Sequence, residues 1–297
     1  MRDLSRTRDR HRPRQRAATR TAAGLVVTVV AVLCALASNA RAATIRLTAG
    51  RDNTLFDDPL GSISNGAGGY SFVGTSGNGV VRRAVIGFDL GAVPAGSTVT
   101  AATLTMFMSQ TISGTVPVTV HRLLAEWGEG TSDSGGTATS GGGNGAPATP
   151  GDATWIYRSF PGSTWIAAGG DFAATTTAAA DVAGPAAYVW TGAGLASDVQ
   201  GWLNGPASNH GWILLGDETT TASAKRFNTR ENLDSSTRPQ LTLEVTPPLA
   251  RLVPLRRWAL LLLAGALVTA AVRASSGKVG SLPPAMRGLA APIDRRA

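Results

Sequence analysis

The chain has 297 residues, a single cysteine and a formal net charge of +8. Residues 1–42 carry nine Arg against two Asp and residues 249–297 carry eight Lys or Arg against one Asp, whereas residues 43–248 carry ten Lys or Arg against sixteen Asp or Glu. Basic charge is therefore confined to the two flanks, which argues against a nucleic-acid-binding surface in the central segment. Because Cys34 is the only cysteine, a disulfide framework and a thiolate metal site are also excluded.

The N-terminal flank, residues 1–42, has the pattern of a secretory signal peptide. A basic stretch over 2–20 precedes an apolar stretch over 22–37, and Ala40-Arg41-Ala42 offers small residues for cleavage. This order predicts export of the mature chain. An uncleaved N-terminal anchor is the alternative interpretation.

Residues 43–248 are predicted to form one all-β domain. Apolar and polar residues alternate along four segments, 84–90, 99–108, 116–124 and 240–245. Such alternation is typical of strands that are buried on one face, and turn sequences such as Pro94-Ala95-Gly96 separate them. The pattern favours an antiparallel β-sandwich.

Two segments depart from this strand pattern. Leu195, Val199, Trp202 and Leu203 have the spacing of a short amphipathic helix that ends at Asn204-Gly205-Pro206. Residues 128–151 are rich in Gly, Ser and Thr, so they are predicted to form a long surface loop.

The C-terminal flank, residues 249–297, contains a second hydrophobic segment over 258–272, closed by Arg273. Its fifteen residues are short for a hydrocarbon core of about 30 Å, although Arg side chains can extend the reach of a helix. The segment resembles the C-terminal sorting tails of exported proteins, but more residues follow it than in such tails. It is expected to tether the domain to a membrane, either as a permanent anchor or as a sorting tail that is later cleaved.

Several short motifs occur in an order that resembles the DNRLRE-type domain, a jelly-roll family related to family 96 carbohydrate-binding modules. They include 49–55, 83–90, 94–99, 127–130 and the closing block over 201–245. The resemblance implies a jelly-roll fold and a non-catalytic module found on extracellular enzymes and cell-surface proteins, often with inferred sugar binding. It does not imply a particular ligand.

Three aromatic residues are candidates for ligand binding. Trp155, Tyr157 and Trp165 flank a segment rich in Gly and Pro, where exposed rings could stack on the faces of sugars. The alternative is that these rings cap the core beneath the long loop.

Oxygen-bearing residues near the first strand are candidates for a structural Ca²⁺ site, which jelly-roll modules commonly hold. Asp52, Asp57, Asp58 and Asn65 offer the hard oxygen ligands that this ion prefers. A solvated acidic loop without a metal is the alternative.

The charged segment 225–231 is expected to lie on a strand and to form a structural charge network, since buried charges are usually paired. In this interpretation Arg226, Arg230 and Glu231 alternate with Phe227 along the strand. Their expected partners are Asp217 and Glu218.

No catalytic motif is evident. The central domain has two histidines, His121 and His210, without a nucleophile motif or a metal-binding pair. Glu126 and Glu129 are spaced closely enough to be considered as glycosidase carboxylates, but nothing else supports that role.

The sequence thus predicts an exported, surface-associated β-sandwich module that is not an enzyme and that binds polysaccharide or another extracellular ligand. A structural or adhesive protein without a small ligand is the second interpretation. A polysaccharide-degrading enzyme is the third, and it would require a groove that joins His121 and Glu126 to an Arg or a Tyr.

Overall fold

The computed structural model describes residues 42–135, 142–205 and 207–248, together with residues 262, 265, 266 and 269. The predicted signal peptide and most of the predicted C-terminal tail lie outside the described residues. Among those that are described, no helix is both long enough and apolar enough to cross a membrane.

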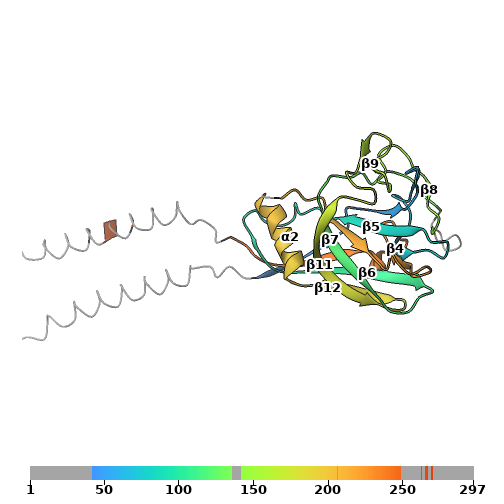
Figure 1. The fold of residues 1–297 in the computed structure, drawn as a ribbon. Helices are drawn as coiled ribbons and strands as arrows, with labels where there is room; N and C mark the ends of the chain where they lie inside the picture. The colour runs from blue at the N-terminus through green and yellow to red at the C-terminus, as the bar shows by residue number, and fades with distance from the viewer. Residues whose placement is uncertain are drawn as a thin grey trace, which may run out of the picture. The chain divides into compact units, whose positions relative to one another are not determined.

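Between residues 42 and 248 the described chain consists mainly of β-strands, with one α-helix (Figure 1). The helix is α2 (Ala193–Asn204). The strands are β1 (Ala43–Thr48), β2 (Arg51–Phe56), β3 (Ile63–Ser64), β4 (Tyr70–Thr75), β5 (Val81–Gly87), β6 (Thr98–Thr111), β7 (Val116–Leu123), β8 (Ala146–Pro147), β9 (Tyr157–Ser159), β10 (Ser163–Thr164), β11 (Phe172–Val182), β12 (Ala186–Thr191), β13 (Trp212–Leu215), β14 (Lys225–Asn228) and β15 (Gln240–Thr246).

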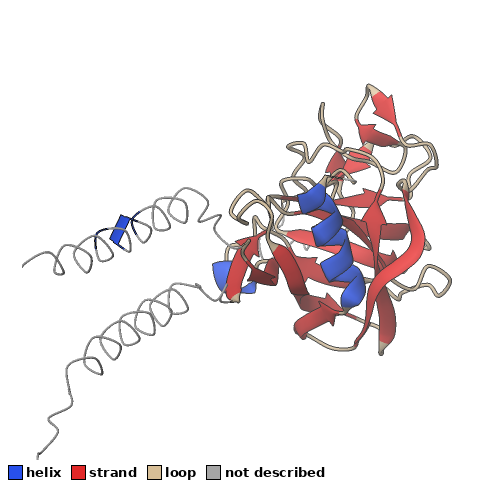
Figure 2. Cartoon of the chain, turned by 90° about the vertical axis from the view of Figure 1, so that its left-hand side faces the viewer, coloured by secondary structure: helices blue, strands red, loops and turns tan. Residues whose placement is uncertain are grey.

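The main sheet has the strand order β1-β15-β6-β14-β4-β5-β13-β7-β11, with β12 added beside β6 and β2 added beside β5. All of these pairings are antiparallel, which confirms the prediction of a mostly antiparallel β-domain. Strand β4 joins the two halves, because Tyr70–Val73 pair with β14 while Gly74 and Thr75 pair with β5. The sheet therefore curls back on itself (Figure 2).

The main hydrophobic core lies inside the curl. Leu104, Met106 and Met108 of β6 are almost fully buried and share this core with Val118 and Val120 of β7. The residues between them in β6 are half-buried. The alternation predicted for these two segments is confirmed, and removal of these side chains from water is the main stabilising contribution.

Helix α2 confirms the predicted amphipathic segment. Its buried residues are Leu195, Val199 and Trp202, and it packs against β6 and β11. Gly205 follows the helix with φ of 81°, a left-handed conformation that glycine adopts without strain.

A second, smaller hydrophobic cluster lies on the other face of β2, β5 and β13. Leu55, Val85 and Ile213 project from these strands and contact side chains of the loops that follow β7, including Trp127 and Trp165. Strands β5 and β13 are thus covered on both faces, which explains why Trp212–Leu215 is continuously apolar rather than alternating.

The described ends of the Gly-rich segment 128–151 are bound to the domain by backbone hydrogen bonds. Ala67 N donates to Ser132 O at 2.8 Å, and Ala153 N donates to Gly128 O at 2.8 Å. Strand β8 within this segment also pairs with β3. The described part of the predicted surface loop therefore has fixed attachments, and it carries residues that matter for the candidate site.

Candidate functional site

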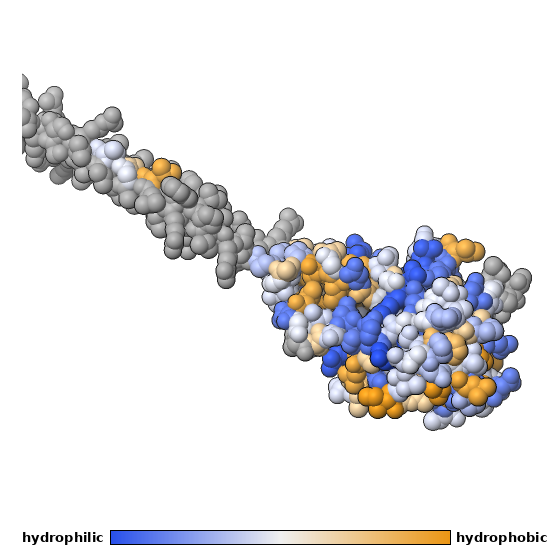
Figure 3. Space-filling model, turned by 90° about the horizontal axis from the view of Figure 1, so that it is seen from above, coloured by the Kyte–Doolittle hydropathy of each residue, from blue (hydrophilic) through white to orange (hydrophobic). Residues whose placement is uncertain are grey.

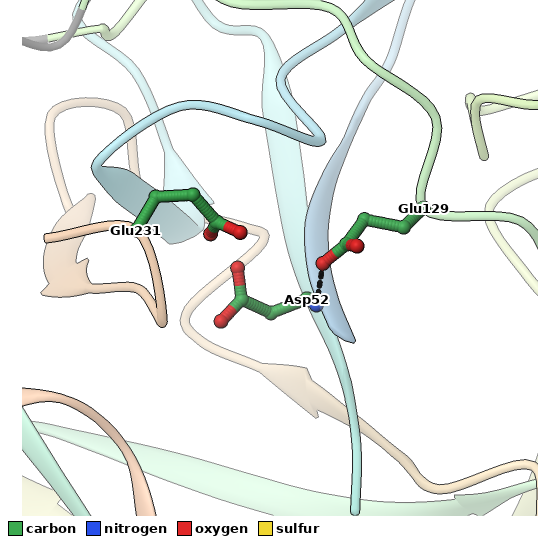
Figure 4. A group of neighbouring side chains, drawn as sticks. All are labelled: Asp52, Glu129 and Glu231. Carbon is green, nitrogen blue, oxygen red and sulfur yellow. Dashed lines mark hydrogen bonds between the residues drawn. The ribbon is translucent and has the colours of Figure 1, made fainter. Parts of the chain in front are cut away.

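Three carboxylates converge at one point of the described structure. Asp52 lies in β2, Glu129 lies in the loop after Trp127, and Glu231 lies in the turn after β14. One oxygen from each lies within 4.8 Å of the others. Figure 4 shows the Asp52 and Glu231 carboxylates facing each other, with Glu129 on the opposite side of the β2 backbone.

Arg230 is the only guanidinium that forms ion pairs with this cluster in the described chain. Its Nε lies 2.7 Å from Glu129 Oε1 and 2.7 Å from Glu231 Oε1, and its Nη2 donates to Glu129 Oε2 at 2.8 Å. Its backbone N donates to Asp52 Oδ2 at 2.8 Å. Three carboxylates with one guanidinium leave two negative charges without a paired cation when all are ionised.

Two oxygens of the cluster are buried without a hydrogen-bond partner among the described residues, namely Asp52 Oδ1 and Glu231 Oε2. Asp52 is only 2% exposed. Burial is the largest cause of a pKa of Asp52 well above its ordinary value, and repulsion from Glu231 and Glu129 adds to it. Burial likewise raises the pKa of Glu231 to about 7, with repulsion from Glu129 acting against the lowering effect of Arg230.

The position of Glu129 is fixed by contacts of its backbone as well as of its side chain. Asn53 Nδ2 donates to Glu129 O at 2.8 Å, and the amide of Asp52 donates to Glu129 Oε1 at 2.8 Å. Gly66 allows this approach, since a Cβ at that position would overlap the Glu129 carbonyl. The adjacent Gly130 has φ of 72°, which favours glycine.

Only one of the four residues predicted to bind Ca²⁺ belongs to this cluster. Asp52 does, whereas Asp57 and Asp58 do not. Asp58 instead accepts hydrogen bonds from Ser62 N and Ser62 Oγ at 2.6 and 2.8 Å. Asn65 is buried, and its amide donates to Tyr70 O at 2.8 Å while its oxygen accepts from Ser134. The described structure therefore groups Asp52 with Glu129 and Glu231 rather than with Asp57 or Asp58, and the predicted calcium site stays a prediction.

A second region, the arginine pocket, is lined by Arg82 of β5 and Arg226 of β14 together with Phe72, Gln110 and Ile112. It is a surface pocket of about 250 Å³. Neither arginine forms an ion pair with a carboxylate among the described residues. Ile112 is 80% exposed beside them.

Aromatic rings support both guanidinium groups of the arginine pocket. Arg226 lies 4.0 Å from the centroid of the Tyr70 ring, and Arg82 lies 5.3 Å from that of Phe72. Arg82 Nε is buried without a hydrogen-bond partner among the described residues. Burial lowers the pKa of both arginines from its ordinary value, but guanidinium remains charged in proteins.

A further pocket of about 310 Å³ lies along Arg51, Phe88, Asp89 and Asn209. Its arginine already has partners, because Arg51 forms an ion pair with Glu126 and donates to Trp127 O at 2.6 Å. Glu126 also forms a hydrogen bond with His210, in which Oε2 of Glu126 lies 2.7 Å from Nδ1 of His210. These contacts join the loop after β7 to the turn before β13, so we assign this network a structural role.

In the described part of the chain, His121 and Glu126 have separate contacts and do not touch each other. This histidine is 8% exposed, and its ring nitrogens contact Ala173 O at 3.0 Å and Thr119 Oγ1 at 3.1 Å. Glu126 lies beside His210 instead, and Glu129 belongs to the carboxylate cluster. The pair Glu126 and Glu129 thus divides between two networks.

The three aromatic candidates occupy different environments. Trp165 is 5% exposed in the second hydrophobic cluster, and its ring N–H donates to Thr154 O at 2.9 Å, so it cannot offer a ring face to a sugar in this structure. Trp155 is half-buried, with the Arg83 guanidinium 4.8 Å from its ring centroid. Tyr157 is half-buried and packs edge-on against Phe160. Trp165 therefore agrees with the alternative interpretation, in which the rings cap the core beneath the loop.

The predicted charge network has other partners than those expected. Glu218 pairs with Arg83 at 2.7 Å rather than with a residue of the segment 225–231. Asp217 accepts from Thr219 and Thr220, and these hydrogen bonds lower its pKa. Strand β14 ends at Asn228, so Arg230 and Glu231 lie in the following turn and not on the strand. That turn directs them toward Asp52 and Glu129.

The surface of the domain mixes polar and apolar side chains. On the face shown in Figure 3, strongly hydrophilic residues form a band, with apolar residues gathered on one side of it and only scattered on the other. Comparison with models of known protein families gives no match, and comparison with curated protein sequences gives none either.

Proposed function

We propose that the chain is an exported, surface-associated and non-catalytic binding module with a jelly-roll β-sandwich, similar to DNRLRE-type domains. The flanks over 1–42 and 258–272 support export and attachment to a membrane. The curled antiparallel sheet is compatible with a jelly roll. The proposed ligand is an extracellular polysaccharide.

The observation that carries this proposal is the arginine pocket. Two guanidinium groups without a carboxylate partner in the described chain, together with the Gln110 amide, provide several hydrogen-bond donors in one place. The described lining contains no carboxylate, histidine or cysteine, so it offers donors for binding but no general acid or base. This chemistry favours recognition over catalysis.

The pocket also indicates the kind of polysaccharide. Arginine forms two parallel hydrogen bonds with a carboxylate, and it does so best where water is partly excluded. The pocket is smaller than the roughly 300–1,000 Å³ of sites that enclose a whole drug-sized ligand. It therefore suits one acidic unit of a longer chain, with the neighbouring units outside near Ile112.

The test is affinity electrophoresis of the full-length chain in detergent, through gels that contain polygalacturonate or dextran. We expect retardation by the acidic polymer only. Replacing both Arg82 and Arg226 by Gln should weaken the retardation by about tenfold or more, because each charged hydrogen bond contributes about 1.5–3 kcal/mol.

The basic flanks attract any polyanion, so a control with the same loss of charge is needed. Arg46→Gln combined with Arg158→Gln provides it, because Arg46 is exposed on β1 and Arg158 lies on β9, outside the pocket. Equal retardation of the two double variants would reject the pocket as the binding site. Retardation that depends on Tyr157 instead would restore the aromatic hypothesis.

Two other outcomes would favour the remaining interpretations. Self-association without retardation by any polysaccharide would support a structural or adhesive protein. Release of new reducing ends from the polysaccharide would support a degrading enzyme.

A further inference from the structure

The carboxylate cluster of Asp52, Glu129 and Glu231 has no role in the proposed polysaccharide binding. It shares no residue with the described lining of the arginine pocket and is fixed by its own contacts. We propose that Asp52, Glu129 and Glu231 bind one Ca²⁺ ion, which stabilises the domain by joining β2, the loop after β7 and the turn after β14. This proposal does not depend on the identity of the ligand at the arginine pocket.

The first argument is the two unpartnered oxygens. Buried polar atoms in proteins nearly always have a hydrogen-bond partner, and an exception calls for a ligand, an ion or a functional role. Asp52 Oδ1 is such an exception within the described chain, on a side chain that is 2% exposed. Glu231 Oε2 is another, and the two carboxylates face each other (Figure 4).

The second argument is distance. Ca²⁺ binds oxygen at about 2.3–2.6 Å, so two oxygens on opposite sides of one ion are about 4.6–5.2 Å apart. The three carboxylate oxygens all lie within 4.8 Å of one another. The three oxygens are therefore close enough for one ion to contact all of them after small movements of the side chains.

The third argument is charge. When all three carboxylates are ionised, they exceed the single paired guanidinium of Arg230 by two negative charges, which one divalent cation would balance. Arg230 does not compete for the unpartnered oxygens, because its bonds reach Glu129, Glu231 Oε1 and Asp52 Oδ2. It holds the carboxylates together and leaves the other oxygen of Asp52 and of Glu231 available.

The donor set selects the kind of ion. The cluster contains only carboxylates, whereas zinc and copper sites in proteins usually include His or Cys. Mg²⁺ sheds its water reluctantly and requires near-ideal octahedral geometry. A largely buried site that offers carboxylates directly favours Ca²⁺, which accepts irregular oxygen coordination.

The test measures calcium binding by the full-length chain in detergent, with titration calorimetry for stoichiometry and thermal unfolding for stability. We expect one Ca²⁺ per chain. At a concentration about 100-fold above its dissociation constant, Ca²⁺ should raise Tm by about 5–10 °C relative to the protein in EGTA. The same concentration of Mg²⁺ should raise it much less.

Three substitutions locate the ion. Asp52→Asn and Glu231→Gln keep the shape of each side chain but remove a ligand charge, so each should abolish the calcium-dependent rise in Tm. Asp58→Asn is the matched control, because Asp58 is acidic, lies near β2 and is absent from the cluster. It should keep the full rise.

The proposal is overturned if the wild-type chain binds no calcium, or if both cluster variants keep the wild-type response. It is also overturned if Asp58→Asn alone removes the response, or if Mg²⁺ stabilises the chain as strongly as Ca²⁺. The wild-type titration decides the matter even if one variant fails to fold, and the second cluster variant then locates the ion.

Discussion

The carboxylate cluster has more negative groups than paired cations, whereas the arginine pocket has positive groups without paired carboxylates in the described chain. In the cluster, Asp52, Glu129 and Glu231 share Arg230, whereas in the pocket Arg82 and Arg226 form no ion pair with a carboxylate of the described chain. Within the described chain, the cluster has two buried oxygens without a hydrogen-bond partner, and the pocket has one such nitrogen, Arg82 Nε. One domain therefore contains a local excess of negative charge and a local excess of positive charge, which its net charge does not reveal.

Strand β14, which carries Arg226, also carries Lys225, a buried cation whose partners lie within the domain. Its side chain is fully buried, and its Nζ donates to the carbonyls of Ser113, Gly114 and Ala183 at 3.3, 2.5 and 3.0 Å. Among the described residues, the side chain of Arg226, the next residue, instead donates one hydrogen bond, to Ser109 Oγ, and lies over the Tyr70 ring. Neighbouring cations on β14 therefore differ in whether the protein itself satisfies them.

The largest expected effect comes from removal of Arg230, the only guanidinium among the described residues that pairs with the cluster. In calcium-free buffer, Arg230→Met should lower the free energy of unfolding by about 3 kcal/mol, because it leaves Glu129 and Glu231 without their partner. Urea unfolding in EGTA measures this change. Exposed Arg46 provides the control, and Arg46→Met should change stability by less than about 0.5 kcal/mol. Equal effects of the two substitutions would show that the cluster is not held by its charges.

The same substitution in the arginine pocket should have a different result. Arg82→Met removes a desolvated charge but keeps an apolar side chain beside Phe56 and Phe72, so stability should change by less than about 1 kcal/mol in either direction. Retardation by polygalacturonate should fall at the same time. A loss of stability as large as that of Arg230→Met would mean that Arg82 is a structural residue.

Acidity should affect the calcium-free protein through Glu231. Its pKa is raised to about 7 in the folded chain, above its ordinary value, so the folded state holds a proton that the unfolded state has released. Stability in EGTA should therefore fall as pH rises from about 5 to about 8. Urea midpoints across this range test it. A stability that rises over this interval in EGTA would contradict the assigned environment of Glu231. The Glu231→Gln variant should show a weaker dependence of stability on pH, because it lacks this titrating group.

The smallest expected effect concerns Asp58, which the sequence suggested as a calcium ligand. Asp58→Asn should lower stability by about 1 kcal/mol or less, because it weakens the two hydrogen bonds from Ser62. Thermal unfolding with and without calcium should show the same shift in both conditions. A calcium-dependent shift would place the ion near Asp58 rather than at the cluster.

The strands could be predicted because the alternation of apolar and polar residues can be read from a short stretch of sequence. Leu104, Met106 and Met108 face the core as predicted, and α2 follows from the spacing of Leu195, Val199 and Trp202. The second hydrophobic cluster could not be predicted in this way. Its covering residues, such as Trp165, come from loops that have no periodic pattern.

The carboxylate cluster could be predicted only in part. Asp52 was a candidate because it stands near other acidic residues, but Glu129 and Glu231 come from segments far away in the sequence. Asp52 and the amide of Arg230, which are hydrogen-bonded, are 178 residues apart. Strand order and the turn after β14 bring them together, and neither is a property of a local motif. The short Trp127–Gly130 motif could have indicated a fixed acidic loop, although not its partners.

Crystallography with anomalous scattering from calcium-soaked crystals of the protein would locate the proposed ion directly. We expect one calcium peak bonded at about 2.3–2.6 Å to an oxygen of Asp52, of Glu129 and of Glu231. A peak at Asp57 or Asp58, or no peak within bonding distance of Asp52, would contradict it.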